Sequence, residues 1–110
     1  MISIDITSKE VRKILKKVEK DEIKKARQSI KASLVVGAGR ASQKAPVDTG
    51  TLRQSIDSRV TDAKGLDGEI FTGVNYARYQ NNGTSRLKGK RFMEKGIRYA
   101  QKVFIKLMKR

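Results

Sequence analysis

The sequence contains no histidine, no cysteine and no tryptophan, and these absences exclude several kinds of chemistry. Without cysteine there is no disulfide and no thiol nucleophile. Without histidine there is no Ser-His-Asp triad and no histidine-based zinc site. Catalysis would have to rest on carboxylates, lysine, tyrosine or an oxygen-ligated metal. The composition therefore favours a protein that binds other macromolecules over an enzyme.

Long apolar runs are also missing. The longest obvious run is Leu34-Val35-Val36, far below the ~18 residues that cross a bilayer, so we expect no membrane contact. The residues from Met1 to Asp5 have neither a basic lead nor an apolar stretch, so we expect no signal peptide. A length of 110 residues predicts a single domain over 1–110. Because 37% of residues are apolar and Trp is absent, its core should be modest and built mostly from aliphatic side chains.

Positive charge is what the chain has in excess. It has 26 Lys and Arg against 11 Asp and Glu, for a net charge of +15. Such a charge attracts polyanions and raises the rate of encounter with them. Charge alone leaves two interpretations open: a solvated surface that meets a partner of opposite charge, or direct contact with nucleic acid.

The N-terminal part of the chain predicts an extended segment followed by helix. Isoleucines alternate with polar residues over 1–7, as in a short strand or extended arm. Thr7 precedes Glu10 by three residues, the spacing of a capping box, so a helix should begin there. Apolar spacing predicts helical structure over 8–45, as one long bent helix or as two helices broken near Lys20-Asp21.

Two features mark the second half of this helical region. A stripe of small residues predicts close packing, against either the protein's own sheet or another subunit; it comprises Ala32, Ser33, Gly37, Ala38, Gly39, Ala41 and Ser42. Pro46 then disfavours helical geometry at Ala45, so the helix should end near Lys44.

The remainder predicts a small sheet and a final helix. A first strand is expected from Leu52 to Thr61 and a second from Glu69 to Asn75, paired as an antiparallel hairpin over 51–75. An aromatic segment and a basic loop occupy 76–91. Helical apolar spacing then predicts an amphipathic helix over 92–110. The expected fold is α+β: a long N-terminal helix that is bent or split, a small central antiparallel sheet, and a C-terminal amphipathic helix.

Three clusters of residues make the sequence specific. They are Ala45-Pro46-Val47-Asp48-Thr49-Gly50-Thr51-Leu52-Arg53-Gln54-Ser55-Ile56, then Val74-Asn75-Tyr76-Ala77-Arg78-Tyr79, then Gly83-Thr84-Ser85 followed by Phe92. In the first cluster, Asp48 and Thr49 can close a turn through side chain-to-backbone hydrogen bonds, and Gly50 permits unusual backbone angles. Gly83 and Thr84 belong to a second turn. The six predicted turn residues are Pro46, Asp48, Thr49, Gly50, Gly83 and Thr84.

In this order and spacing the clusters resemble tail-completion proteins of long-tailed phages, the head–tail joining or neck-adjacent minor tail components called gp-ten-like. Their pattern is APVDTG-x-L-R-x-S-I, then V-x-Y-A-x-Y, then E-x-G-T, then P-F-L. The resemblance spans Ala45 to about Ile97. The chain departs from the pattern at Asn81, where the family has Glu, and at Arg91, where it has Pro before Phe. These departures put in doubt any contact that the acid makes in relatives, and the path of the loop before the last helix.

The resemblance implies a structural subunit of a phage or prophage particle. It implies assembly into a ring, commonly of six copies, that completes the tail tube and forms the docking surface for the head connector. It implies no catalysis, no cofactor and no metal, and a place in the virion after assembly in the host bacterial cytoplasm. Seven residues are the candidate interface, because aromatic side chains dominate interface energetics: Tyr76, Tyr79, Asn81, Arg86, Lys88, Arg91 and Phe92.

Three other interpretations compete with this one. The stretch from Arg86 to Arg110 has ten Lys or Arg and one acid, so its helix could follow phosphates as a nucleic-acid-binding module without reading sequence. The same helix could lie on a membrane surface, although packing on the protein's own sheet is favoured. A metal-dependent nuclease is disfavoured, because the carboxylates near the hairpin lie in turns or alternate along strands, and no carboxylate–x–Lys pairing follows Glu69.

Overall fold

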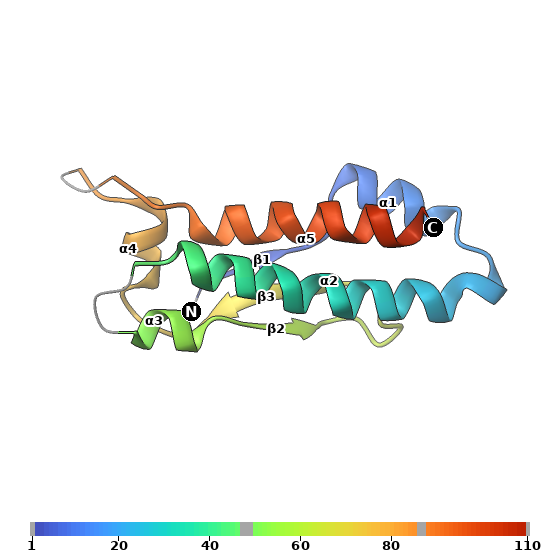
Figure 1. The fold of residues 1–110 in the computed structure, drawn as a ribbon, viewed down its shortest axis with the longest axis horizontal. Coiled ribbons are helices and arrows are strands. Elements are labelled where there is room, and N and C mark those ends of the chain that lie inside the picture. Colours follow the sequence, from blue (N-terminus) through green and yellow to red (C-terminus); the bar gives the residue numbers. More distant parts are fainter. Residues whose placement is uncertain (1, 47–49, 86–87, 110) are drawn as a thin grey trace.

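The chain folds into two layers, with two long helices on one side of a small antiparallel sheet (Figure 1). The computed structural model describes residues 2–46, 50–85 and 88–109. The elements in order are β1 (Ile2–Asp5), α1 (Lys9–Lys16), the 3₁₀ turn η1 (Lys20–Glu22), α2 (Ile23–Lys44), α3 (Thr51–Ser55), β2 (Asp57–Val60), β3 (Gly68–Thr72), α4 (Ala77–Asn82) and α5 (Phe92–Met108). The predicted α+β class, with its helices around a small sheet, is confirmed.

The helical region over 8–45 is split rather than bent. α1 ends at Lys16, and η1 separates it from α2, which matches the predicted break near Lys20-Asp21. The expected capping box is wrong by one residue: Ser8 is the N-cap, and its hydroxyl accepts a hydrogen bond from the Val11 N–H at 3.2 Å. The Thr7 hydroxyl instead donates to the Asp67 carboxylate, 60 residues away. A long-range partner therefore takes the side chain that the local pattern assigned to the cap.

The sheet has the order β1-β3-β2, with β3 antiparallel to both neighbours. The predicted hairpin is present as β2 and β3, and the predicted N-terminal strand becomes the third member of the sheet. Along β3, buried and half-buried residues alternate: Gly68, Ile70 and Thr72 face the helices, and Glu69 and Phe71 face away. One face of the sheet therefore belongs to the core, and the other is covered by none of the long helices.

The prediction of a strand from Leu52 to Thr61 is wrong in its first half. Residues 51–55 form the short helix α3, and the strand occupies only Asp57–Val60. The spacing of four residues between Leu52 and Ile56 fits one helical turn as well as one face of a strand, so periodicity could not separate the two. The second strand also ends earlier than predicted, at Thr72.

Within the subunit the small-residue stripe packs mainly against α5, which corrects the expectation that it would lie on the sheet. The expected alternative, contact with another subunit, stays a prediction. A Cβ placed on Gly37 would lie 2.6 Å from the Ala100 Cβ and 2.8 Å from the Gly96 carbonyl oxygen. A Cβ placed on Gly96 would lie 2.6 Å from the Ala41 Cβ. The backbones of α2 and α5 thus approach each other closely, because each helix presents small residues at the crossing.

The predicted C-terminal helix is present as α5, and its apolar face forms much of the core. Its buried apolar residues include Phe92, Met93, Ile97, Ala100 and Phe104. Because this face packs on α2 and the sheet, the prediction that the helix docks on its own domain is confirmed. In the described part of the chain, no helix combines the length and apolar character needed to cross a bilayer.

Candidate interaction surface

The first motif cluster builds a corner that ends α2. Pro46 follows Ala45, whose backbone is extended (φ −73°, ψ 152°), so α2 ends at Lys44 as predicted. The Arg53 guanidinium then reaches back to the last turn of α2. Its Nε donates to the Ala45 carbonyl at 3.0 Å, and a terminal nitrogen donates to the Gln43 carbonyl at 3.1 Å. Arg53 therefore caps carbonyl groups that the end of a helix leaves without an intrahelical partner.

The corner is tied to the end of β3 by hydroxyl groups. The Ser55 hydroxyl lies 2.6 Å from the Thr72 hydroxyl and donates to the Leu52 carbonyl at 2.7 Å. The Thr72 hydroxyl also accepts from the Val74 N–H at 3.3 Å. The first cluster thus fixes where the second cluster leaves the sheet. Serine and threonine in these positions link two segments that are separate in the sequence.

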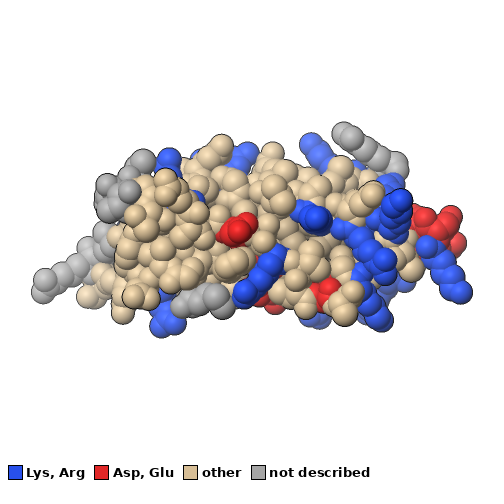
Figure 2. Space-filling model, turned by 90° about the horizontal axis from the view of Figure 1, so that it is seen from below, with Lys and Arg blue, Asp and Glu red and all other residues tan. Residues whose placement is uncertain are grey.

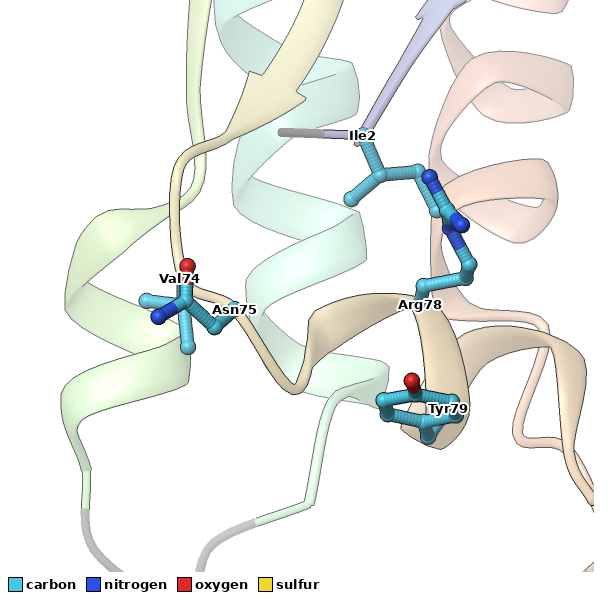
Figure 3. Close-up of a pocket in the computed structure, with 5 residues that line it drawn as sticks. All are labelled: Ile2, Val74, Asn75, Arg78 and Tyr79. Atoms are coloured by element: carbon cyan, nitrogen blue, oxygen red, sulfur yellow. The ribbon is translucent and has the colours of Figure 1, made fainter.

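The second cluster surrounds a cavity at this end of the molecule (Figure 3). The cavity has a volume of about 200 Å³ and is lined by Ile2, Val74, Asn75, Arg78 and Tyr79. Ile2 comes from the start of β1, and Arg78 and Tyr79 come from α4. We call this region, with Tyr76, the aromatic end. Ala77 anchors it because this residue is completely buried at the start of α4.

Aromatic side chains are distributed unevenly over the protein. Phe92 and Phe104 are completely buried, and Phe71 and Tyr99 are half-buried with the guanidinium of an arginine over each ring. Tyr76 and Tyr79 are 39% and 57% exposed. Both strongly exposed aromatic residues of the chain therefore lie at the aromatic end. Large aromatic side chains on a surface are typical of contact sites with other proteins.

The loop between α4 and α5 is held closed at its base. Gly83 and Lys88 form an antiparallel bridge. The Lys90 N–H donates to the Gln80 carbonyl and the Arg91 N–H donates to the Asn81 carbonyl, both at 2.9 Å. The exposed lysine and arginine side chains of this loop, among them Lys88 and Arg91, therefore lie beside α4, next to the aromatic end.

Two predicted interface residues lie inside the subunit, and their assignment to an interface is corrected. Phe92 is 0% exposed and belongs to the core. Asn81 is 1% exposed, and its side-chain oxygen accepts a hydrogen bond from the Met93 N–H at 2.9 Å. Its amide nitrogen donates to the Glu94 carboxylate at 2.8 Å. These two residues fasten the start of α5, so they support the surface from within.

The remaining residues predicted for the interface or the turns fall into three groups: exposed residues, residues in turns, and residues that the structure does not describe. Thr84, Lys88 and Arg91 are exposed. Gly50 and Gly83 have φ values of 71° and 85°, which agrees with their prediction as turn residues, and Arg91 has φ 52°. Pro46 is half-buried after α2. Asp48, Thr49 and Arg86 lie outside the described residues.

Sequence reasoning missed Arg53, Ser55 and Thr72 as the residues that hold the corner. Arg53 and Ser55 belong to the first motif cluster, so a signal was present, but it does not reveal their partners. The partner of Ser55 lies 17 residues away. Arg53 and Ser55 meet their hydrogen-bond partners only in the folded structure.

Charge is distributed unevenly as well. Seen from the side of β2, the charged side chains gather toward the end where α2 begins, and the end with α3 and α4 shows few of them (Figure 2).

On the outer face of the sheet, burial and the repulsion of Asp67 and Glu69 raise the pKa of Asp5 above its ordinary value of 3.8. No group of three or more acidic residues in the described ranges is arranged to hold a metal ion.

Comparison with known proteins gives one family. The family model described as "Bacteriophage HK97-gp10, putative tail-component" matches residues 9–83, more than half of the chain. The matched stretch contains the first motif cluster, the aromatic end from Val74 to Tyr79, and Gly83. No curated protein and no solved structure matches significantly.

Proposed function

The chain belongs to the HK97-gp10 family of bacteriophage tail components, and from this we propose that it completes the tail and joins it to the head as a ring of identical subunits. Family membership supports a structural role in the virion and a non-enzymatic protein. The proposal adds the place, the ring and the partners: the tail tube on one side, the head connector on the other, and further copies of the chain between them.

The aromatic end supports this proposal most directly. It combines two exposed tyrosines with a cavity of about 200 Å³ whose wall includes the exposed Arg78. Aromatic side chains and arginine are enriched in the surfaces that protein partners bury. We therefore assign the aromatic end to contact with a neighbouring protein of the particle.

The test is complementation of particle assembly. The gene is deleted from the phage or prophage that encodes it, and wild-type or Tyr79→Ser protein is supplied in trans. Electron microscopy then counts joined particles against separate heads and tails. We expect the deletion to yield separate heads and tails, the wild-type protein to restore joined particles, and Tyr79→Ser to restore few of them.

Val35→Ser is the matched control, because Val35 is 59% exposed and lies on α2, away from the aromatic end, and Tyr79 is 57% exposed. It should restore joined particles as the wild type does. Normal particles from the deletion strain would contradict the proposed function. Full activity of Tyr79→Ser would contradict the assignment of the aromatic end.

One observation favours a second candidate function, non-specific contact with DNA. Basic residues of α5 face outward: Arg98, Lys102 and Lys106 are all exposed. Such a row can follow phosphates without reading bases. Tight binding of duplex DNA by the pure protein at physiological salt, lost steeply as salt rises, together with normal particles from the deletion strain, would favour this function over tail completion.

A further inference from the structure

The outer face of the sheet is covered by neither of the long helices. α2 and α5 pack on the side of Ile70 and leave the side of Phe71 open. The cross-strand register places Asp57 opposite Phe71, and Asp5 and Arg59 opposite Glu69. These residues therefore share the outer face, together with Ser3. We call this surface the open sheet face.

The open sheet face has the opposite charge from the rest of the protein. Its carboxylates are Asp5, Asp57, Glu69 and the adjacent Asp67, and its strand residues contribute a single base, Arg59. Arg59 is committed locally: it pairs with Glu69 at 2.8 Å and lies 4.3 Å from the centre of the Phe71 ring. Burial, and then repulsion from Asp67 and Glu69, raises the pKa of Asp5, which agrees with an excess of carboxylates on this face. A negative face on a protein of net charge +15 disfavours DNA and favours a basic protein surface.

The chain carries a basic surface of matching size. Arg98, Lys102 and Lys106 are exposed along α5, and residues 95–109 contain no acid. At 1.5 Å per residue this row is about 12 Å long. Asp57 and Asp5 are two strands apart and offset by two residues, which also separates them by about 12 Å at ordinary strand spacing. The two rows can therefore align charge against charge.

We propose that the open sheet face of one copy binds the basic row of α5 in a second copy. The two surfaces are different parts of the same molecule, so the contact is heterologous, and such contacts repeat head to tail and close into rings when the rotation allows. The proposal rests on the proposed function, because it assigns the self-contact of the ring described there.

Charge reversal in pairs of residues tests this contact. The sheet variant is Asp5→Lys with Asp57→Lys, and the helix variant is Lys102→Glu with Lys106→Glu. Each variant places like charges opposite each other, so we expect its self-association to fall by about tenfold or more. Mixed in equal amounts, the variants should associate again, because reversed sheet faces then meet reversed helices and native faces meet native ones. Sedimentation velocity over a range of concentrations measures the self-association of each variant and of the mixture, and circular dichroism shows whether each variant is folded.

Controls with the same change in net charge separate a local contact from a general effect. Asp21→Lys with Glu22→Lys matches the sheet variant, and Lys16→Glu with Lys17→Glu matches the helix variant; all four positions are exposed and lie near η1. These controls should associate as the wild type does. Recovery in the mixture alone supports the contact. A monomeric wild type, unchanged association of either variant, or a mixture that does not recover overturns it, and particle counts from the deletion strain decide the proposed function separately.

Discussion

The side-chain oxygen of Asn81 accepts a hydrogen bond from the backbone N–H of Met93, at 2.9 Å and across twelve residues. Through this bond the last turn of α4 fastens the first turn of α5, which is the helix that closes the core. The bond is completely buried, and the amide of Asn81 also binds the carboxylate of Glu94 at 2.8 Å. The orientation of the aromatic end thus depends on a residue that no partner can touch.

Asn81→Ala should lower the free energy of unfolding by about 1–3 kcal/mol, because it leaves a buried N–H and a carboxylate without their partner. Asn75→Ala, at an exposed position, should change it by less than about 0.5 kcal/mol. Chemical denaturation measures both. Equal effects of the two variants would show that the Asn81 contacts contribute nothing to stability.

The family pattern has Glu at the position of Asn81, and the structure indicates that Glu would not fit here. A carboxylate at position 81 would face Glu94 and would lack the donor that Asn81 supplies. Asn81→Glu should therefore destabilise more than Asn81→Ala at neutral pH, and addition of Glu94→Gln should recover part of the loss. An unfolding midpoint at or above that of the wild type for Asn81→Glu would contradict the assigned contact.

The crossing of α2 and α5 predicts opposite effects for two glycines that are two residues apart. Gly37→Ala forces a methyl group against Gly96 and Ala100, so it should destabilise by about 1–3 kcal/mol. Gly39→Ala meets nothing within 4 Å, so it should stabilise by about 0.5–1 kcal/mol through helix propensity. Thermal unfolding of the two variants gives the sign directly. A stabilising effect of Gly37→Ala would mean that the helices are farther apart than described.

Arg53 holds the corner after α2, and its replacement should loosen that corner. Arg53→Ala removes two hydrogen bonds to the end of α2 and should cost about 1–2 kcal/mol. Arg53→Lys keeps the charge but lacks the planar guanidinium, so it should recover little of the loss. Lys44→Ala, at an exposed position between the two residues whose carbonyl groups Arg53 binds, is the control for lost charge. Full stability of Arg53→Lys would show that charge alone acts at this position.

The raised pKa of Asp5 predicts that the stability of the fold depends on pH. Its pKa is raised by burial, then by Asp67 and Glu69, so the folded state holds its proton at a higher pH than the unfolded state does. The charged form therefore costs stability at neutral pH, and that cost disappears as the pH falls through the raised pKa. Asp5→Asn should raise the unfolding midpoint at pH 7 and give no gain below about pH 3.8, the ordinary value. Asp21→Asn, at an exposed site, should show no such difference between the two pH values.

Much of the fold could be predicted because local signals determine it. Pro46 ends α2 through the geometry that it imposes on Ala45, and the slip in apolar spacing near Lys20 marks the break between the helices. These effects need no knowledge of distant residues. The same holds for α5, whose apolar face has a helical period over its whole length.

The parts of the fold and of the site that could not be predicted depend on contacts between residues distant in the sequence. The small residues at Gly37 and Ala41 indicated close packing but could not identify α5 as the partner. Phe92, as an aromatic residue after a basic loop, and Asn81, as the first residue of a predicted turn, were interface candidates, yet long-range packing buries both. Tyr76 and Tyr79 are exposed as an interface would require, whereas Arg53, which holds the end of α2, had no signal apart from its place in the motif.

Electron cryomicroscopy of the junction between head and tail tests the central claim most directly. We predict that this chain forms a closed ring at the head-proximal end of the tail, with Tyr76 and Tyr79 against a neighbouring protein. Particles that contain the chain nowhere at this junction would contradict the account.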